Sequence, residues 1–147
     1  MVGLLTTSPA GAYVTDSAAA ASAMSTGFKV KNGAVSITPD GASPRTVMEA
    51  ARAAGKRIGL VTTATVSDAT PAAFALHAVS RRDSQALVSQ LLALEPDVLM
   101  GGGADYFLPE GVPGGKRQDG QDVIAAFRAR GHAVVRTPGE LAAVSGP

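Results

Sequence analysis

The sequence predicts an α/β domain built around a largely parallel β-sheet. Short runs of β-branched residues, typical of buried strands, alternate along the chain with longer segments that show helical spacing and helix end signals. This alternation is the pattern of α/β proteins, in which helices connect parallel strands. The length of 147 residues fits one domain or a part of one. Residues 1–147 are therefore expected to belong to a single domain.

The first part of the chain contains two predicted helices and one strand. A β-prone tripeptide at 13–15 leads directly into a run of small residues, which predicts a helix beginning near Ser17 at the edge of a sheet. A second helix is expected over 44–54, because Ser43 and a following proline form a helix start and a glycine follows the last helical position. The apolar run at 57–62 predicts the first buried strand.

The middle of the chain repeats the same alternation. Thr70 as an N-cap, followed by a proline, predicts a helix over 72–79. Leucines and valines recur at helical spacing over 84–94 and form one apolar stripe. A short apolar run at 97–100 then predicts the second strand.

The last third begins with the least regular stretch of the sequence. Residues 101–120 are rich in glycine and proline, and we expect them to form a long surface excursion. A helix is predicted over 121–130 and a strand over 133–136. Thr137 and Pro138 then signal a last short helix.

Composition excludes several classes of function. A formal net charge of +1 gives no support for nucleic-acid binding or for an electrostatic membrane anchor. The absence of cysteine excludes disulfides, thiolate metal sites and cysteine nucleophiles. No apolar run approaches about 18 residues, so no membrane span is predicted. The first five residues are too short and lack the basic flank of a signal peptide, so none is expected in this chain.

Ser17 is the first candidate for chemistry. The unpaired amide groups and the dipole at a helix N-terminus favour an anion such as phosphate, and a hydroxyl there is well placed to attack a phosphoryl group. The competing interpretation is that Asp16 or Ser17 is a simple helix cap, and from the local pattern alone a cap is the better interpretation.

A serine needs a base or a metal ion to become a good nucleophile. The imidazole candidates are His77, expected within a helix, and His132, expected at the start of a strand; neither lies in a recognisable triad motif. Activation by a metal is therefore the simpler hypothesis.

A second group of polar residues follows the strand at 57–62. Asp68 and Thr70 are two positions apart, so in an extended segment their oxygens point to one side, as a partial Mg²⁺ site requires. Arg81 offers a planar fork that matches two phosphate oxygens. Each residue has a plainer interpretation: a helix start for the first two, and for Arg81 and Arg82 an exposed pair near a helix end.

Taken together, these segments resemble the alkaline phosphatase family. The resemblance covers about residues 3–144. Its most specific parts are YVTDSAAAASAMSTGFKVKNGA and RTVMEAARAAGKRIGLVTTATVSDATPAAFALHAVSRR, supported by PDVLMGGGADYF and, less specifically, by the tail GQDVIAAFRARGHAVVRTPGELAAV. The resemblance implies a doubly wound, mainly parallel sheet flanked by helices. It also implies phosphate monoester hydrolysis through a covalent phosphoserine.

The resemblance assigns roles to five residues. Ser17 is the nucleophile and would also bind zinc through its hydroxyl, and Asp16 orients the phosphate-binding arginine, which is Arg81. Asp68 and Thr70 belong to the magnesium site; some relatives carry histidine where this chain has Asp68. The implied cofactors are Zn²⁺ and Mg²⁺. Family members also suggest a homodimer and a periplasmic or extracellular location.

Parts of the family pattern are absent from this sequence. No D-G-x-G motif precedes the nucleophile, and no D-x-x-x-H or D-H pattern supplies zinc ligands. We therefore expect an incomplete form of the fold, a fragment of the enzyme with little activity alone.

Two other functions remain open. One is a catalytically inactive α/β module that binds phosphate or a partner protein. The other is a serine hydrolase with His77 as its base.

Overall fold

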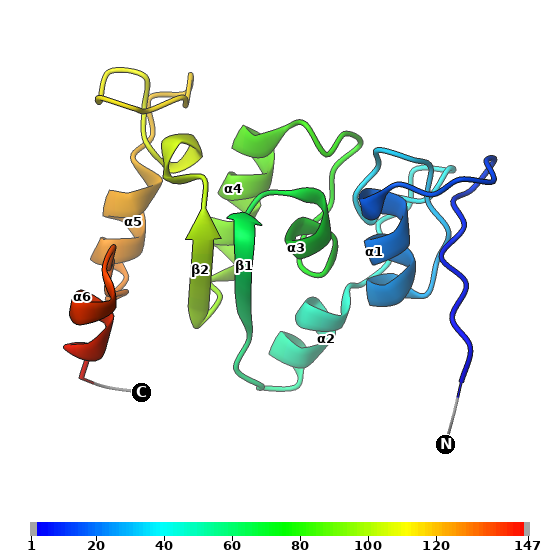
Figure 1. Cartoon of the computed structure of the whole chain (residues 1–147), viewed down its shortest axis with the longest axis horizontal. Helices are drawn as coiled ribbons and strands as arrows, with labels where there is room; N and C mark the ends of the chain where they lie inside the picture. Colours follow the sequence, from blue (N-terminus) through cyan, green and yellow to red (C-terminus); the bar gives the residue numbers. More distant parts are fainter. Residues whose placement is uncertain (1–2, 146–147) are drawn as a thin grey trace.

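The computed structural model of the chain describes residues 3–145 (Figure 1). Four residues lie outside the described part of the chain: Met1, Val2, Gly146 and Pro147. Both ends of the predicted domain, and the first two of the five residues in which no signal peptide is expected, therefore lie outside it as well. In chain order the elements are α1 (Ser17–Thr26), α2 (Val47–Ala53), β1 (Gly59–Thr65), α3 (Ala69–Ala73), α4 (Ser84–Leu94), β2 (Val98–Gly102), the 3₁₀-helix η1 (Ala104–Phe107), α5 (Val123–Ala129) and α6 (Pro138–Ala142). Within residues 3–145, no helix is both long and apolar enough to cross a membrane.

The sheet confirms the predicted α/β class with parallel strands. β1 and β2 pair in parallel, with Leu60 opposite Leu99 and Val61 opposite Met100. α3 and α4 form the connection between the two strands, because parallel neighbours need a crossover. Leu60 faces the core, whereas Val61 on the opposite face is 75% exposed.

Small side chains let the elements around α1 approach closely. α1 packs against α3, and Ala18 of α1 and Ala69, Ala72 and Ala73 of α3 are completely or almost completely buried. The larger members of the core come from α4, whose Leu87, Val88 and Leu91 are fully buried, as the apolar stripe predicts. Alanine-rich packing holds the start of α1 close to the segments that follow α3, where the candidate site lies.

Two helices begin at other residues than the sequence signals indicate. α2 begins after Thr46 instead of Ser43, because Thr46 and Glu49 form a reciprocal capping box. α3 is capped by Asp68 and ends at Ala73, so the helix predicted over 72–79 is wrong. The chain from Phe74 onward turns away and forms a bridge with residues near 35.

Two predicted β segments form no strand. Residues 13–15 lead into α1 as irregular chain, with Tyr13 completely exposed, so Ser17 does not follow a sheet edge. Residues 133–136 have no strand partner within residues 3–145. Both segments, 13–15 and 133–136, have residues with high β propensity. Neither has a neighbouring strand within residues 3–145 with which to form backbone hydrogen bonds.

Residues 101–120 are more ordered than their glycine and proline content indicates. The segment begins with the end of β2 and includes η1, whose Phe107 packs into the core. Gly101 needs to be glycine, because a Cβ would lie 2.8 Å from both Thr62 and Val66. Arg117, completely buried, ties the later part of the segment to α4.

Candidate active site

Ser17 lies at the start of α1, where the sequence predicts it. It is the first residue of the helix and is exposed. Asp16 is the N-cap: its Oδ1 accepts a hydrogen bond of 2.8 Å from the amide of Ala19. The cap and the candidate nucleophile are therefore different residues, so the cap leaves the Ser17 hydroxyl available for another partner.

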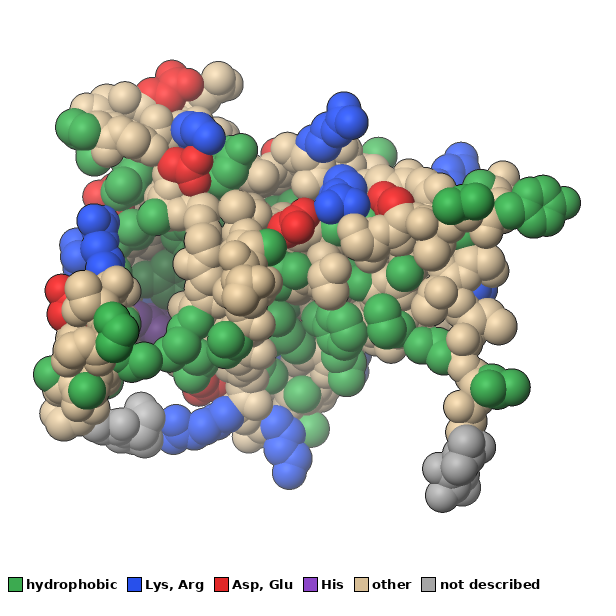
Figure 2. Space-filling model, in the orientation of Figure 1, with side chains coloured by type: hydrophobic (Ala, Val, Ile, Leu, Met, Phe, Trp, Pro, Cys, Tyr) green, Lys and Arg blue, Asp and Glu red, His purple; other side chains and the backbone are tan. Residues whose placement is uncertain are grey.

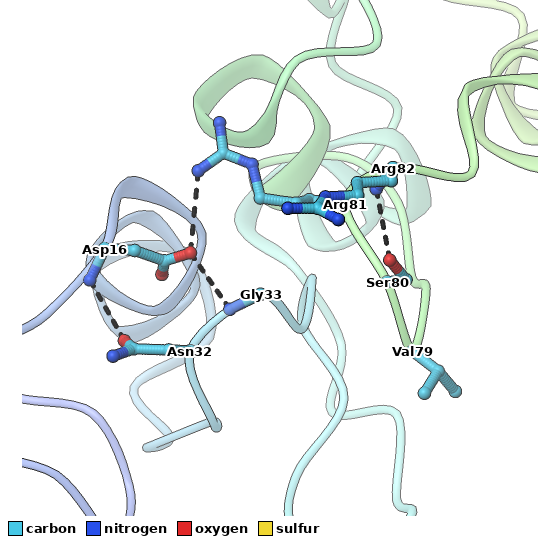
Figure 3. A pocket seen from close by; sticks show the side chains of 7 residues that line it. All are labelled: Asp16, Asn32, Gly33, Val79, Ser80, Arg81 and Arg82. Atoms are coloured by element: carbon cyan, nitrogen blue, oxygen red, sulfur yellow. Dashed lines mark hydrogen bonds and ion pairs between the residues drawn. The ribbon is translucent and has the colours of Figure 1, made fainter.

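Asp16 is fixed by a turn that sequence analysis did not single out. The amide of Gly33 donates to Asp16 Oδ2 at 2.9 Å, and the side chain of Asn32 accepts from the Asp16 amide at 3.0 Å (Figure 3). Gly33 has a φ of +83°, a conformation that favours glycine. The dipeptide Asn32-Gly33 is a strong signal for a turn, although this signal does not show that the turn contacts Asp16.

Arg81 joins the two ends of the candidate site. Its Nη1 donates to Ser17 Oγ at 2.7 Å and lies 3.5 Å from Asp16 Oδ2. Its Nη2 donates to Asp68 Oδ1 at 2.8 Å. The backbone amide of Arg81 donates to the carbonyl of Gly33 at 2.7 Å, which fixes the base of the side chain. The structure thus brings together Asp16, Ser17, Asp68 and Arg81, which the sequence singled out separately.

An open hollow of about 570 Å³ lies beside this cluster. Its lining residues are Asp16, Asn32, Gly33, Val79, Ser80, Arg81 and Arg82. Figure 2 shows positive and negative side chains gathered along the same edge of the molecule. Arg81 lines the hollow and contacts the Ser17 hydroxyl at the start of α1, and an arginine fork beside a helix N-terminus is a suitable environment for a small anion.

Asp68 and Thr70 are arranged differently from the extended pair that the sequence predicts. Asp68 caps α3, while Thr70 lies within the first turn of that helix and is exposed. A hydrogen bond from the Ala69 amide and the charge and hydrogen bond of Arg81 hold the pKa of Asp68 below its usual value. Asp68 is therefore a carboxylate at neutral pH, with one oxygen bonded to Ala69 and Arg81.

His77 does not reach Ser17. Its ring nitrogens lie 2.9 Å from the carbonyl oxygen of Ser36 and 3.0 Å from Glu49 Oε2. His132 stacks edge-on against Phe127, in the C-terminal part of the chain. Within residues 3–145 neither imidazole bonds to Ser17, and this arrangement gives no support to a serine hydrolase with His77 as base.

The carboxylates and histidines of residues 3–145 form no cluster of three or more that could hold a metal ion. Zinc in proteins needs three or four nitrogen, sulfur or carboxylate ligands, so the described residues do not fit a zinc site of their own. Magnesium usually keeps several waters and needs one or two protein oxygens. The carboxylate of Asp68 and the hydroxyl of Thr70 are oxygen ligands of the type that this smaller requirement accepts.

Comparisons with known proteins identify the group to which this chain belongs. The family model described as alkaline phosphatase matches residues 1–146. The chain belongs to the alkaline phosphatase family.

Curated members of the alkaline phosphatase family match most of this chain. The streptomycin-6-phosphate phosphatase of Streptomyces griseus is 42% identical over a match that covers 89% of this chain and 33% of the relative. The repressible alkaline phosphatase of Saccharomyces cerevisiae is 37% identical, with 88% and 25% covered. The chain therefore spans about a quarter to a third of the length of these alkaline phosphatases.

Solved alkaline phosphatases share the fold. The Thermus thermophilus enzyme superposes with a TM-score of 0.87 at 42% identity, over 97% of this chain and 29% of that one. A mutant of the TAB5 alkaline phosphatase, solved with Mg bound, has a TM-score of 0.76 at 34% identity, over 86% of this chain and 35% of that one. These matches confirm the predicted family and fold class.

Proposed function

We propose that this chain carries the nucleophile-bearing part of a metal-assisted phosphate monoesterase that works through a covalent phosphoserine at Ser17. The observation that carries the proposal is the contact of 2.7 Å between Arg81 Nη1 and Ser17 Oγ, beside an open hollow at the start of α1. Membership of the alkaline phosphatase family supports the same reaction.

The residues of this chain have distinct tasks in the proposed reaction. The Arg81 fork holds two non-bridging phosphate oxygens, and Asp16 keeps that fork pointed at Ser17. Ser17 Oγ gives up its proton and forms a bond to phosphorus while the ester P–O bond breaks; the departing oxygen takes up a proton and leaves as the alcohol. Water then cleaves the phosphoserine and releases inorganic phosphate. Most of the catalysis in such a transfer is positioning and charge stabilisation, which suits a rigid arginine and a helix N-terminus.

Metal ions complete the proposed site. Asp68 and Thr70 would hold magnesium, and the Ser17 hydroxyl would approach zinc. Bound metal ions would supply charge that lowers the pKa of a hydroxyl or a water and stabilises a leaving oxygen. Because residues 3–145 contain no zinc ligand cluster, we propose that the chain by itself has little activity.

A chimaeric enzyme tests the function directly. The matching segment of the Thermus thermophilus alkaline phosphatase would be replaced by this chain, since the two superpose closely. We expect the chimaera to hydrolyse p-nitrophenyl phosphate and Ser17→Ala to reduce turnover to background. Ser84→Ala is the matched control, because Ser84 likewise begins a helix, α4, after a capping aspartate but does not line the hollow. Undiminished turnover in Ser17→Ala would overturn the proposal. The isolated chain with added Zn²⁺ and Mg²⁺ should show no turnover above background, and robust zinc-dependent hydrolysis would contradict this second point.

A second candidate function is a catalytically inactive module that binds phosphate or a partner protein. The observation in its favour is an intact arginine–serine pair without a metal cluster in residues 3–145. Calorimetry would then show that the chain binds phosphate. The Thermus thermophilus enzyme would lose its turnover when this chain replaces its matching segment.

The remaining properties follow from the family. We propose a phosphate monoester as substrate, with no nucleic acid as partner, since the net charge is +1. A homodimer and a periplasmic or extracellular location are proposed on family membership alone. Size-exclusion chromatography with light scattering would test the dimer.

A further inference from the structure

A short backbone pairing joins residues 33–36 to residues 77–81. Val35 and Ala78 exchange two hydrogen bonds of 2.9 Å, and the Arg81 amide donates to the Gly33 carbonyl at 2.7 Å. The same segment reaches the nucleophile side, since the Gly33 amide donates to Asp16. The pairing therefore sets the position of Arg81 relative to the start of α1.

His77 lies at the far end of this pairing and has all its polar groups engaged. The side chain of Gln90 on α4 accepts from the His77 amide at 2.9 Å and donates to its carbonyl at 2.7 Å. The ring Nδ1 contacts the Ser36 carbonyl oxygen, and Nε2 contacts Glu49. One histidine thus links the pairing to both α2 and α4.

Both ring partners of His77 are acceptors. A backbone carbonyl can only accept, and Glu49 is a carboxylate: burial raises the pKa of Glu49, but hydrogen bonds from Thr46 and His77 outweigh it and lower that pKa overall. Each ring nitrogen of His77 therefore faces an acceptor, and the ring bridges the Ser36 carbonyl and the Glu49 carboxylate. Glu49 is the charged side chain that contacts the ring within residues 3–145, and the α4 contact, Gln90, is neutral.

The Ser36 carbonyl belongs to a constrained residue. Ser36 is completely buried with a φ of +49°, a left-handed conformation that is uncommon for serine. Its amide donates to Ser22 Oγ of α1 at 2.8 Å, and its hydroxyl donates to the Ala73 carbonyl at 2.8 Å. The remaining polar group of Ser36 is its backbone carbonyl oxygen, and the His77 ring bonds to it. Strain of this kind persists only where surrounding contacts hold it.

We propose that His77 is a positioning residue: through its ring contacts with Ser36 and Glu49, it holds the 33–36/77–81 pairing in place and so keeps Arg81 against Ser17. The description of Arg81 as a phosphate-binding group rests on the proposed function; the positioning itself does not. His77 touches neither Ser17 nor Arg81, so it acts through the backbone.

Nitrogen-15 NMR of the imidazole side chains in the unaltered chain is the first test. A ring N–H of His77 bonded to Ser36 or Glu49 should exchange slowly with water and stay visible in the spectrum, with His132 as the internal comparison. A His77 ring N–H that exchanges as fast as that of His132 would overturn the proposal. This measurement needs no variant and no enzymatic activity.

Two substitutions separate hydrogen bonding from space filling. His77→Phe keeps a ring of similar size and removes both donors, whereas His77→Gln keeps an amide donor. We expect His77→Phe to speed hydrogen exchange of the Ala78 and Arg81 amides by about tenfold and to shift the Arg81 side-chain signal, because charge-assisted bonds are lost. His77→Gln should restore part of the protection. Equal protection in His77→Phe and the parent would contradict the proposal.

A stability control excludes a general loosening of the fold. Phe127→Leu weakens the core near α5, far along the chain from the pairing. When its loss of unfolding free energy equals that of His77→Phe, it should still leave the Arg81 side-chain signal unchanged. An Arg81 signal that moves equally in this control would overturn the positioning role. Binding of inorganic phosphate is measured separately and reports on the proposed function. If His77→Phe shifts the Arg81 side-chain signal as expected but the unaltered chain does not bind phosphate, only the proposed function is refuted.

Discussion

Arg81 and Arg117 are the same side chain in two opposite environments. Arg117 is completely buried, and its guanidinium donates to Asp119, to the carbonyls of Gln85 and Tyr106, and to Ser89. The Arg81 side chain is 30% exposed, borders an open hollow and contacts Asp16, Ser17 and Asp68.

The difference separates a structural arginine from one available to a ligand. Every nitrogen of Arg117 has a partner within the protein, so the side chain joins the 101–120 segment to α4 and leaves nothing for another molecule. The Arg81 partners are a hydroxyl and carboxylates at the surface, and in the proposed function a bound phosphate would replace some of these bonds. The two arginines should therefore respond differently to the same substitution.

The largest expected effect is on stability in Arg117→Ala. This change leaves the carbonyls of Gln85 and Tyr106 and the hydroxyl of Ser89 without their buried donor, and leaving buried polar groups unsatisfied costs about 1–3 kcal/mol of unfolding free energy. Urea denaturation followed by circular dichroism would measure the loss. A loss of unfolding free energy below about 1 kcal/mol would show that buried Arg117 does not stabilise the fold more than Arg81 does.

Arg81→Ala should show the reverse behaviour. We expect its unfolding free energy to change by no more than about 1 kcal/mol, because its ion pairs are partly exposed. Binding of inorganic phosphate should weaken by about tenfold or more, since charge-assisted hydrogen bonds to the anion are lost. Calorimetry on both arginine variants would give the comparison. Unaltered phosphate affinity in Arg81→Ala would contradict the assignment of the hollow.

Acid should weaken both arginine sites by the same physical route. The hydrogen bond from Arg117 lowers the pKa of Asp119, and the Ala69 amide and Arg81 lower that of Asp68. A carboxyl whose folded pKa is lowered contributes stability above its unfolded value, about 3.9, and this contribution is lost as the pH falls through the folded value. We therefore expect the unfolding free energy to fall below about pH 4. Asp119→Asn and Asp68→Asn should each flatten that slope, and an unchanged slope in both would refute the explanation.

The smallest expected effect is in Arg82→Ala. Arg82 borders the same hollow as Arg81 but makes no ion pair within residues 3–145. Its removal should change the unfolding free energy by no more than about 0.5 kcal/mol, as at other exposed positions. Phosphate affinity should fall less than in Arg81→Ala. An equal or larger fall would show that charge alone, and not the fixed fork of Arg81, determines binding.

The sequence predicts the parts of this molecule that depend on local signals. α4 follows its leucine stripe, and α6 begins at the Thr137-Pro138 signal. Ser17 lies in the first turn of α1, because small residues after Asp16 favour a helix and an aspartate caps it. The two parallel strands follow their apolar runs.

Features that depend on contacts between distant residues could not be predicted locally. The role of Asn32 and Gly33 depends on Asp16, and the end of α3 at Ala73 depends on the pairing of Ala78 with Val35. The burial of Arg117 inside a glycine-rich segment gave no signal, because an arginine in such a stretch is usually exposed.

Chemical trapping of the covalent intermediate would show whether Ser17 is the nucleophile. The chimaera that carries this chain would react with p-nitrophenyl phosphate, be quenched in acid, and be digested for peptide mass spectrometry. We predict one phosphate, located on Ser17, and its absence in Ser17→Ala under the same conditions. Turnover without a phosphorylated Ser17, or phosphate on another residue, would contradict the account.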